Sequence, residues 1–321
     1  MVLEEPRALD ELRALDELRA LDELRALVDR HARTGTTPTA VPGVVVSRMT
    51  TSGSPDESTT GTVLAVVAQG TKTLSVGGTV HGYGPGQYVV ASVDLPVSGW
   101  FTDATPATPA LGMGLTLRPE VVAELMLGPA ATAFPRPAPG AVAPAVAVGR
   151  AGDRLLDACV RLLRLLDHPR DIPVLAPLVE REILWLLMSD EQGATVRQLG
   201  LADSSLNRVR HVVRWMRERY SEPVRVAELA RLASMSPSAF HRTFQAVTAM
   251  SPIQFQKRIR LQEARLRLLA RPGDVAGAAY AVGYESPSQF SREYRRQFGV
   301  PPSRDAALLR QTLDPTGAAP A

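Results

Sequence analysis

The hydrophobic positions at the start of the chain recur every third residue. The hexapeptide Ala-Leu-Asp-Glu-Leu-Arg begins at residues 8, 14 and 20, and most of its residues are good helix formers. A step of three residues falls about 60° short of a full helical turn, so these leucines circle the helix instead of forming one seam. We therefore predict a helix without a sustained dimer face, within a lead-in over residues 1–37.

Between about Val41 and Thr116, short β-rich segments alternate with turn residues such as the Gly82–Gly86 cluster. Several short strands at this spacing are typical of a β-sandwich or a small barrel. The predicted strands are Val44–Met49, Val63–Gln69, Thr73–Val76, Gln87–Val93 and Leu115–Leu117. The proline-rich stretch Pro129–Pro144 is predicted to be a connector.

Two leucine-rich segments with helical spacing follow, at Gly152–Leu166 and Pro173–Met188. Together they predict a helical hairpin packed on the β domain. Their abundant leucines either form core within this domain or leave an apolar face for a second copy of the chain. Residues 189–203 have the composition of a linker.

From Val226 onward one pattern occurs twice: a short apolar helix, a turn, and a second helix that begins with Ser-Pro. Ser236-Pro-Ser-Ala-Phe-His-Arg-Thr-Phe244 corresponds to Ser286-Pro-Ser-Gln-Phe-Ser-Arg-Glu-Tyr294, 50 residues later. Serine followed by proline is a favourable helix start, because serine caps the first turn and proline fits its first position. The pattern predicts two helix-turn-helix units.

Each second helix has an aromatic stripe and a polar face. Phe240 and Phe244, and likewise Phe290 and Tyr294, are four residues apart and are predicted core anchors. Arginine can bond guanine and glutamine can bond adenine in the major groove, whereas serine tolerates either base. The polar side chains off the stripe are Ser238, His241, Arg242 and Gln245 in the first helix, and Ser288, Gln289, Ser291, Arg292 and Arg295 in the second.

Charge separates this region from the rest. The chain has 36 Lys and Arg against 33 Asp and Glu, a net charge of +3. Residues 205–310 hold 19 of the basic and 8 of the acidic residues, which gives +11 there and −8 elsewhere. A basic C-terminal module after an acidic N-terminal one suggests that only the former binds a polyanion.

The cysteine, histidine and apolar content of the chain argues against a secreted, membrane-spanning, metal-binding or catalytic protein. The single cysteine, Cys159, excludes an internal disulfide framework, and no signal peptide or apolar run long enough to span a bilayer is evident. We expect a cytoplasmic protein with no membrane partner. The β region has one histidine, His81, and no paired carboxylates or nucleophile motif. We therefore expect no metal, no cofactor and no enzymatic activity.

Residues 206–305 resemble the DNA-binding domain of the AraC/XylS family. The resemblance rests on 235–244, on Val282-Gly-Tyr-Glu-Ser-Pro-Ser-Gln-Phe-Ser-Arg-Glu-Tyr-Arg-Arg-Gln-Phe-Gly299, and on a connecting helix near 251–265. It implies that the two recognition helices enter successive major grooves of double-stranded DNA. The implied base-facing residues are Ser238, His241, Arg242, Ser288, Gln289 and Arg292. Candidate phosphate contacts are Gln245, Ser291, Arg295 and Arg296.

Three positions depart from the family pattern. Ser234 in the first turn and Ala249 after the first recognition helix stand where the family usually has glycine, and Gln245 replaces a commonly basic residue. If either backbone site needs a positive φ, a residue with a Cβ costs on the order of 1 kcal/mol there. The second unit keeps Gly283 and Gly299.

The region from Val41 to Met188 resembles the family's cupin-like N-terminal domain, through 65–70, 85–88, 92–96 and 171–184. This resemblance implies binding of an unidentified small-molecule effector and formation of a homodimer. Tyr83, Tyr88 and Trp100 are candidate effector-lining residues, or else ordinary packing residues. RNA polymerase is a further partner to consider for a regulator of this kind.

The predicted fold class is α+β: a cupin-like β-barrel or sandwich with two packed helices, followed by an all-helical domain with two helix-turn-helix units. The predicted domains are a lead-in at 1–37, a sensing and dimerisation domain at 38–190, a linker at 191–205, a DNA-binding domain at 206–310 and a disordered tail at 311–321. The expected function is sequence-specific DNA binding that regulates transcription in response to an effector. Two alternatives stay open: a metal-free cupin enzyme with a DNA-binding appendage, and a non-specific architectural DNA binder.

Overall fold

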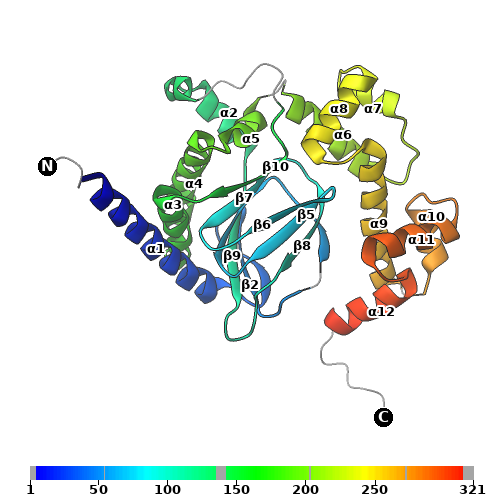
Figure 1. Cartoon of the computed structure of the whole chain (residues 1–321), viewed down its shortest axis with the longest axis horizontal. Coiled ribbons are helices and arrows are strands. Elements are labelled where there is room, and N and C mark those ends of the chain that lie inside the picture. The colour runs from blue at the N-terminus through cyan, green and yellow to red at the C-terminus, as the bar shows by residue number, and fades with distance from the viewer. Residues whose placement is uncertain (1–4, 54, 135–141, 202–203, 272, 314–321) are drawn as a thin grey trace, which may run out of the picture. The chain divides into compact units, whose positions relative to one another are not determined.

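The computed structural model describes residues 5–53, 55–134, 142–201, 204–271 and 273–313. The chain divides into two compact units, Met1–Arg210 with Ala246–Ala249, and His211–Gln245 with Met250–Ala321. Figure 1 shows their elements. Outside the described residues lie 1–4 of the predicted lead-in, 54 of the sensing domain, 135–141 of the connector, 202–203 of the linker, 272 of the DNA-binding domain and 314–321 of the tail.

The first unit is built on two antiparallel sheets. A six-stranded sheet has the order β1-β2-β9-β4-β7-β10, and a four-stranded sheet has the order β3-β8-β5-β6. The strands are β1 (Gly35–Pro38), β2 (Val44–Met49), β3 (Asp56–Thr59), β4 (Val63–Gln69), β5 (Lys72–Val76), β6 (Thr79–Tyr83), β7 (Gln87–Ala91), β8 (Pro96–Phe101), β9 (Ala110–Thr116) and β10 (Val146–Arg150). Four of the five strands predicted from the sequence are confirmed as β2, β4, β5 and β7. The fifth, Leu115–Leu117, overlaps only the end of β9, and the remaining strands were not predicted.

The centre of the larger sheet is a close pairing of β9 with β4 and β2. A Cβ on Gly112 would lie 2.8 Å from the carbonyl oxygen of Val66, and a Cβ on Gly114 would lie 2.9 Å from Cγ2 of Val45. Only glycine allows such an approach without a shift of the neighbours. Leu64, Leu111 and Leu115 are buried around this pairing.

Four helices of the first unit lie beside the six-stranded sheet, and the first of them packs directly on its strands. The four are α1 (Glu5–His31), α2 (Pro119–Leu127), α3 (Asp153–Arg164) and α4 (Ile172–Ser189), with short 3₁₀ helices η1 (Pro129–Ala133) and η2 (Leu165–Asp167). α1 packs against α3 and against β2, β4 and β9, and α3 packs against α4. Figure 1 shows α1, α3 and α4 grouped beside the strands.

The leucines of the three long helices have different environments. Leu24 and Leu27 of α1 are buried whereas Leu15 and Leu18 are exposed, as the circling pattern predicts. The leucines of α3 are almost all buried within the unit. α4 by contrast leaves Val174, Leu175 and Leu178 exposed, so of the two helices in the hairpin it is α4 that carries an exposed apolar face.

Residues 191–205 are not a simple linker, and this prediction is wrong. The segment contains α5 (Gly193–Arg197) and the 3₁₀ helix η3 (Gln198–Gly200), and Val196 and Leu199 are buried. Arg197 is also buried, because its guanidinium donates to the carbonyl of Met188 and lies 5.5 Å from the centre of the Phe134 ring. Buried polar side chains that bond internally, such as Thr195 and Arg197, give this packed segment the composition of a linker.

The second unit is entirely helical over its described residues. Its helices are α6 (Ser205–Glu218), which begins before the boundary between the units, α7 (Val226–Leu232), α8 (Pro237–Thr248), whose residues 246–248 are grouped with the first unit, α9 (Pro252–Ala270), α10 (Val275–Ala281), α11 (Pro287–Phe298) and α12 (Pro302–Leu313). Residues 311–313, expected in the tail, are the end of α12. Among the described helices of the whole chain, none is both long and apolar enough to cross a membrane.

Candidate DNA-binding surface

α7 with α8 and α10 with α11 form the two predicted helix-turn-helix units. Both turns have the same backbone geometry. Ser234 has φ 53° and Gly283 has φ 85°, and the next residue in each turn donates its N–H back to the first helix, from Met235 to Ala230 O at 2.9 Å and from Tyr284 to Ala279 O at 3.0 Å. This is the left-handed helix end that glycine adopts without strain. The first unit makes it with serine.

The starts of the two recognition helices also match. The side-chain Oγ of Ser236 accepts the N–H of Ala239 at 3.3 Å, and Oγ of Ser286 accepts the N–H of Gln289 at 3.3 Å. Each bond satisfies a backbone donor that the first turn would otherwise leave without a partner. The caps therefore fix where the polar face of each helix begins.

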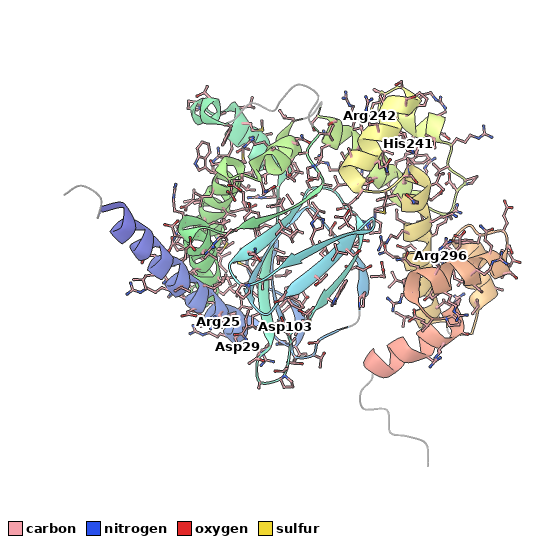
Figure 2. The ribbon with its side chains drawn as sticks, in the orientation of Figure 1. Arg25, Asp29, Asp103, His241, Arg242 and Arg296 are labelled. Atoms are coloured by element: carbon pink, nitrogen blue, oxygen red, sulfur yellow. The ribbon has the colours of Figure 1, made fainter. Side chains whose placement is uncertain are left out.

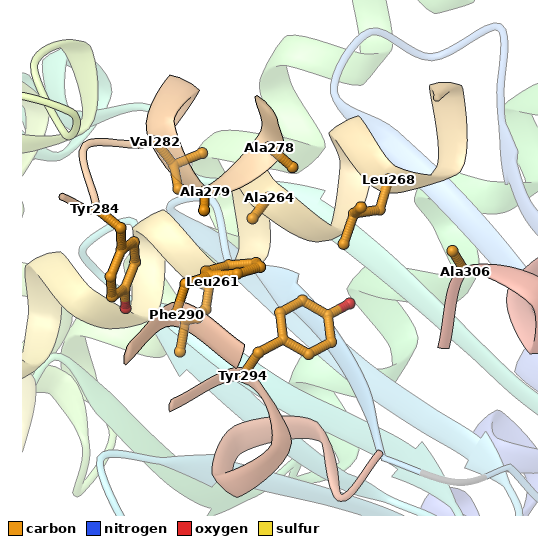
Figure 3. Packing of buried hydrophobic residues seen from close by; sticks show 10 residues of the cluster. All are labelled: Leu261, Ala264, Leu268, Ala278, Ala279, Val282, Tyr284, Phe290, Tyr294 and Ala306. Atoms are coloured by element: carbon orange, nitrogen blue, oxygen red, sulfur yellow. The ribbon is translucent and has the colours of Figure 1, made fainter. Parts of the chain in front are cut away.

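Buried aromatic rings hold both recognition helices against the rest of the unit. Phe240, Phe244, Phe290 and Tyr294 are all fully buried, as predicted. Phe244 meets Phe255 of α9 edge-on at 5.5 Å between ring centres. Figure 3 shows Phe290 and Tyr294 packed with residues of α9 and α10. Burial of each such ring stabilises the fold by roughly 1.5–3 kcal/mol.

The polar face of each recognition helix lies on the surface. Exposed side chains on α8 are Ser238, His241, Arg242 and Gln245, and those on α11 are Ser288, Gln289, Arg292, Arg295 and Arg296. Ser291 is half-buried. His241, Arg242 and Arg296 are marked in Figure 2. Within the described part of the chain, neither Arg242 nor Arg292 has an ion-pair partner, so both guanidinium groups are available for an external acceptor.

α9 connects the two helix-turn-helix units, and its first turn is capped. Ser251 and Gln254 form a reciprocal capping box, in which each side chain accepts the other's backbone N–H. The same helix contributes Phe255 to the first aromatic cluster and Leu261, Ala264 and Leu268 to the second. One rigid helix thereby carries both recognition helices.

Arg260 of α9 ties the two helix-turn-helix units together. Its guanidinium donates to the carbonyl of Tyr220 at 2.7 Å, of Ser221 at 3.0 Å and of Glu222 at 2.9 Å, all in the loop before α7. On its other side it donates to the carbonyl of Gly283 at 2.9 Å, in the turn of the second unit. A planar guanidinium with five N–H donors suits such a junction better than a single ammonium.

Glu293 on α11 accepts three hydrogen bonds, from Lys257 Nζ at 2.9 Å, from the Tyr284 hydroxyl at 2.8 Å and from Gln289 Nε2 at 3.2 Å. Burial acts to raise its pKa, but these bonds outweigh burial and hold the pKa of Glu293 below its usual value. Gln289, an expected base-reading residue, is therefore already oriented by a neighbour one turn away.

A second carboxylate fixes α12. Asp305 is buried, accepts two bonds from Arg265 at 2.8 and 3.2 Å, and accepts the Tyr294 hydroxyl at 2.7 Å. Tyr294 is predictable from the sequence as a core anchor, whereas Arg260, Glu293 and Asp305 were not predicted. Their partners are separated from them by up to 40 residues, and the only available signal was polar residues on the inner side of amphipathic helices.

The three aromatic residues expected to line an effector site have structural contacts. Tyr88 is fully buried, its hydroxyl donates to Asp190 Oδ2 at 2.5 Å, and its ring lies over Gly149 on the paired strand. Tyr83 is buried, and burial raises its pKa. Trp100 is half-buried on β8. No three His, Cys, Asp or Glu side chains of the described chain are grouped so as to hold a metal ion.

Comparison with known proteins agrees with this architecture. The family model described as the AraC-type transcriptional regulator N-terminus matches residues 40–195, and a helix-turn-helix domain model matches residues 229–307. The chain belongs to the AraC/XylS family of transcriptional regulators.

Individual relatives match over part of their length. The HTH-type transcriptional activator RhaS of Yersinia pestis bv. Antiqua (strain Angola) is 29% identical over 149 residues, which cover 46% of this chain and 52% of RhaS. The HTH-type transcriptional regulator ExsA of Pseudomonas aeruginosa is 30% identical over 171 residues, 52% of this chain and 58% of ExsA. The chain thus spans about half the length of the curated relatives it matches.

A solved structure has the same two-part fold. ToxT from Vibrio cholerae, crystallised with a bound unsaturated fatty acid, has a TM-score of 0.50 at 10% identity and covers 87% of this chain and 97% of its own. The prediction of a β-sheet domain followed by an all-helical domain is confirmed.

Proposed function

We propose that this protein is a sequence-specific DNA-binding regulator of transcription in which α8 and α11 each lie in a major groove of double-stranded DNA. The observation that carries the proposal is the repeat itself. Two helices with the same caps and turns expose polar side chains at equivalent positions and bury aromatic rings behind them. Their shared connection to α9 supports simultaneous reading of two grooves on one face of the duplex.

Each recognition helix has its own set of base contacts in this proposal. Ser238, His241 and Arg242 read one groove, and Ser288, Gln289 and Arg292 read the other. Arginine is suited to guanine and glutamine to adenine. Gln245, Ser291, Arg295 and Arg296 lie further round or along the helices and are proposed to contact phosphates, which position the protein without specifying sequence.

We assign sensing and dimerisation to residues 38–190 and DNA binding to residues 206–310. ToxT binds an unsaturated fatty acid in its crystal structure, which supports a small-molecule effector for the N-terminal unit of this protein. Val174 and Leu178 are 66% and 61% exposed on α4. Two such residues on adjacent turns of one helix support a homodimer formed by this face.

The remaining assignments follow from the role of a regulator. We place the protein in the cytoplasm, with RNA polymerase as a further partner at the promoter. We assign it regulation of transcription rather than catalysis, because its family is one of transcriptional regulators.

The division between base and phosphate contacts is tested by two arginine substitutions on α11. Arg292→Ala should cost roughly 1–3 kcal/mol on the preferred duplex and relax base preference at one position. Arg296→Ala should weaken binding to preferred and random duplexes alike and reduce the salt dependence. Affinities are measured on duplexes first selected from a random pool. Equal losses on specific and random DNA for both variants would contradict the division of roles.

A further inference from the structure

The first unit contains a cavity of about 600 Å³ that lies outside the proposed DNA-binding surface. Its walls come from the end of the six-stranded sheet, with Val41 and Leu115, and from the helical hairpin, with Leu162, Ile172 and Ala176. The volume is within the range that small organic ligands occupy in proteins. Tyr83, Tyr88 and Trp100 are not among its lining residues.

Both walls of this cavity contain residues whose backbone conformation is restricted, which favours a preformed site. On the sheet side, Pro42 and Gly43 form a tight turn, closed by the Val44 N–H donating to Val41 O at 3.1 Å. On the helix side, Pro173 and Pro177 line the cavity, and proline rings fix the local backbone. A preformed pocket costs less ordering free energy on binding.

The two charged side chains in the cavity wall, Arg118 and Glu180, form an ion pair with each other. Arg118 donates from Nε to Glu180 Oε1 at 2.6 Å and from Nη2 to Glu180 Oε2 at 2.5 Å. Both carboxylate oxygens are therefore occupied by one guanidinium, and the glutamate side chain is only 12% exposed. An ionised ligand would lose hydration on entering and find no uncompensated charge to bind.

We propose that this pocket binds an uncharged, mainly apolar small molecule. The shape and apolar wall supply the affinity, and the closed Arg118–Glu180 pair discriminates against organic acids and amines. The identification of this small molecule with the effector of the N-terminal unit rests on the proposed function. Ile172 and Ala176 face the cavity, whereas Val174 and Leu178 of the same two turns are exposed. The ligand would thus contact the helix that carries the proposed dimer face.

Two fluorescent probes with the same ring system test the proposal on the full-length protein. N-phenyl-1-naphthylamine is neutral, and 8-anilinonaphthalene-1-sulfonate carries one additional sulfonate. We expect saturable binding of one neutral probe per chain, with an affinity at least about tenfold higher than that of the sulfonate, a difference of about 1.4 kcal/mol. Equal affinities, tighter binding of the sulfonate, or no saturable binding of the neutral probe would overturn the proposal.

Variants locate the binding to this cavity. Ala176→Phe fills its interior, and Ala40→Trp fills its mouth from an exposed position where folding is not at risk. Both should weaken binding of the neutral probe at least about tenfold, whereas Leu127→Ala on α2, at a side chain that is 88% exposed and outside the cavity lining, should leave it unchanged. If Ala176→Phe does not fold, Ala40→Trp still decides. An unchanged affinity in Ala40→Trp would overturn the assignment of the site.

Glu180→Gln tests the charge argument separately. It leaves the Arg118 guanidinium without a carboxylate, so the sulfonate probe should bind at least about tenfold more tightly than to the wild type, while the neutral probe changes little. An unchanged preference would refute the discrimination by the ion pair. The preference of the protein for its selected duplex over a random one is measured on the same preparations. Selective binding of the neutral probe without a duplex preference would refute the proposed function alone. A duplex preference without selective probe binding would refute only the proposed ligand pocket.

Discussion

Replacing Ser234 with glycine should stabilise the first helix-turn-helix unit. Ser234 is exposed and has φ 53°, a conformation that costs a residue with a Cβ roughly 1–2 kcal/mol. Glycine removes this cost but makes the unfolded chain more flexible, an opposing effect of about 0.4–1 kcal/mol. The difference between the midpoints of these two ranges gives an expected net gain in the free energy of unfolding of roughly 0.8 kcal/mol.

In the second helix-turn-helix unit, glycine occupies the left-handed positions, so the reverse substitutions can be made there. Gly299 has φ 79° and no atom within 4 Å of an added Cβ, so Gly299→Ala should cost about 1 kcal/mol from backbone strain alone. Gly283 has φ 85°, and an added Cβ would lie 2.0 Å from the carbonyl oxygen of Ser221. Gly283→Ala should therefore cost clearly more than Gly299→Ala, because the loop that Arg260 holds must also move.

Amide hydrogen exchange of the full-length protein measures this effect where it occurs. In Ser234→Gly, the protected amides of α7 and α8 should exchange roughly two- to fivefold more slowly than in the wild type. Ser234→Ala is the matched control, because it removes the hydroxyl but keeps the Cβ, and it should give no such gain. An equal gain in both variants, or faster exchange in Ser234→Gly, would refute the strain argument.

Two further predictions concern the polar contacts of α9 and α11. Arg260→Lys should retain the fold but weaken binding to the selected duplex by at least about tenfold, because one ammonium cannot join the carbonyls of Tyr220 and Gly283. The affinity is measured by titration of labelled DNA. An unchanged affinity would show that the contacts of Arg260 do not orient the recognition helices. The pKa of Glu293 is lowered on folding, so its ionisation stabilises the folded state above the unfolded pKa, and this contribution is lost as the pH falls. The free energy of unfolding in urea should therefore differ between wild type and Glu293→Gln at neutral pH, and this difference should shrink below about pH 4.5, the ordinary pKa of glutamate. A difference that does not change with pH would argue against a stabilising role for ionised Glu293.

The recognition helices could be predicted from the sequence because their determinants are local. Ser236-Pro237 and Ser286-Pro287 mark where each helix begins, and the aromatic spacing marks which face is buried. Ser234 and Ala249, which stand where the family usually has glycine, have positive φ values of 53° and 58°, so the cost considered conditionally for these two sites applies.

The features that were missed depend on contacts distant in the chain. β10 follows a proline-rich stretch and is a strand because Val146–Arg150 pairs with β7, more than 50 residues earlier. Arg260 is one of many arginines in the basic region, and only the fold shows that it donates to backbone carbonyls on both sides. The apolar pocket likewise depends on the approach of α4 to a turn about 130 residues before it.

The central claim is that two rigidly connected polar helices distinguish DNA sequences. The most direct test compares the Kd of the full-length protein for its selected duplex with the Kd for a scrambled duplex of the same composition, at physiological salt. The account predicts that the selected duplex binds at least about a thousandfold more tightly. Similar Kd values for the two duplexes would mean that the exposed faces of α8 and α11 do not read bases.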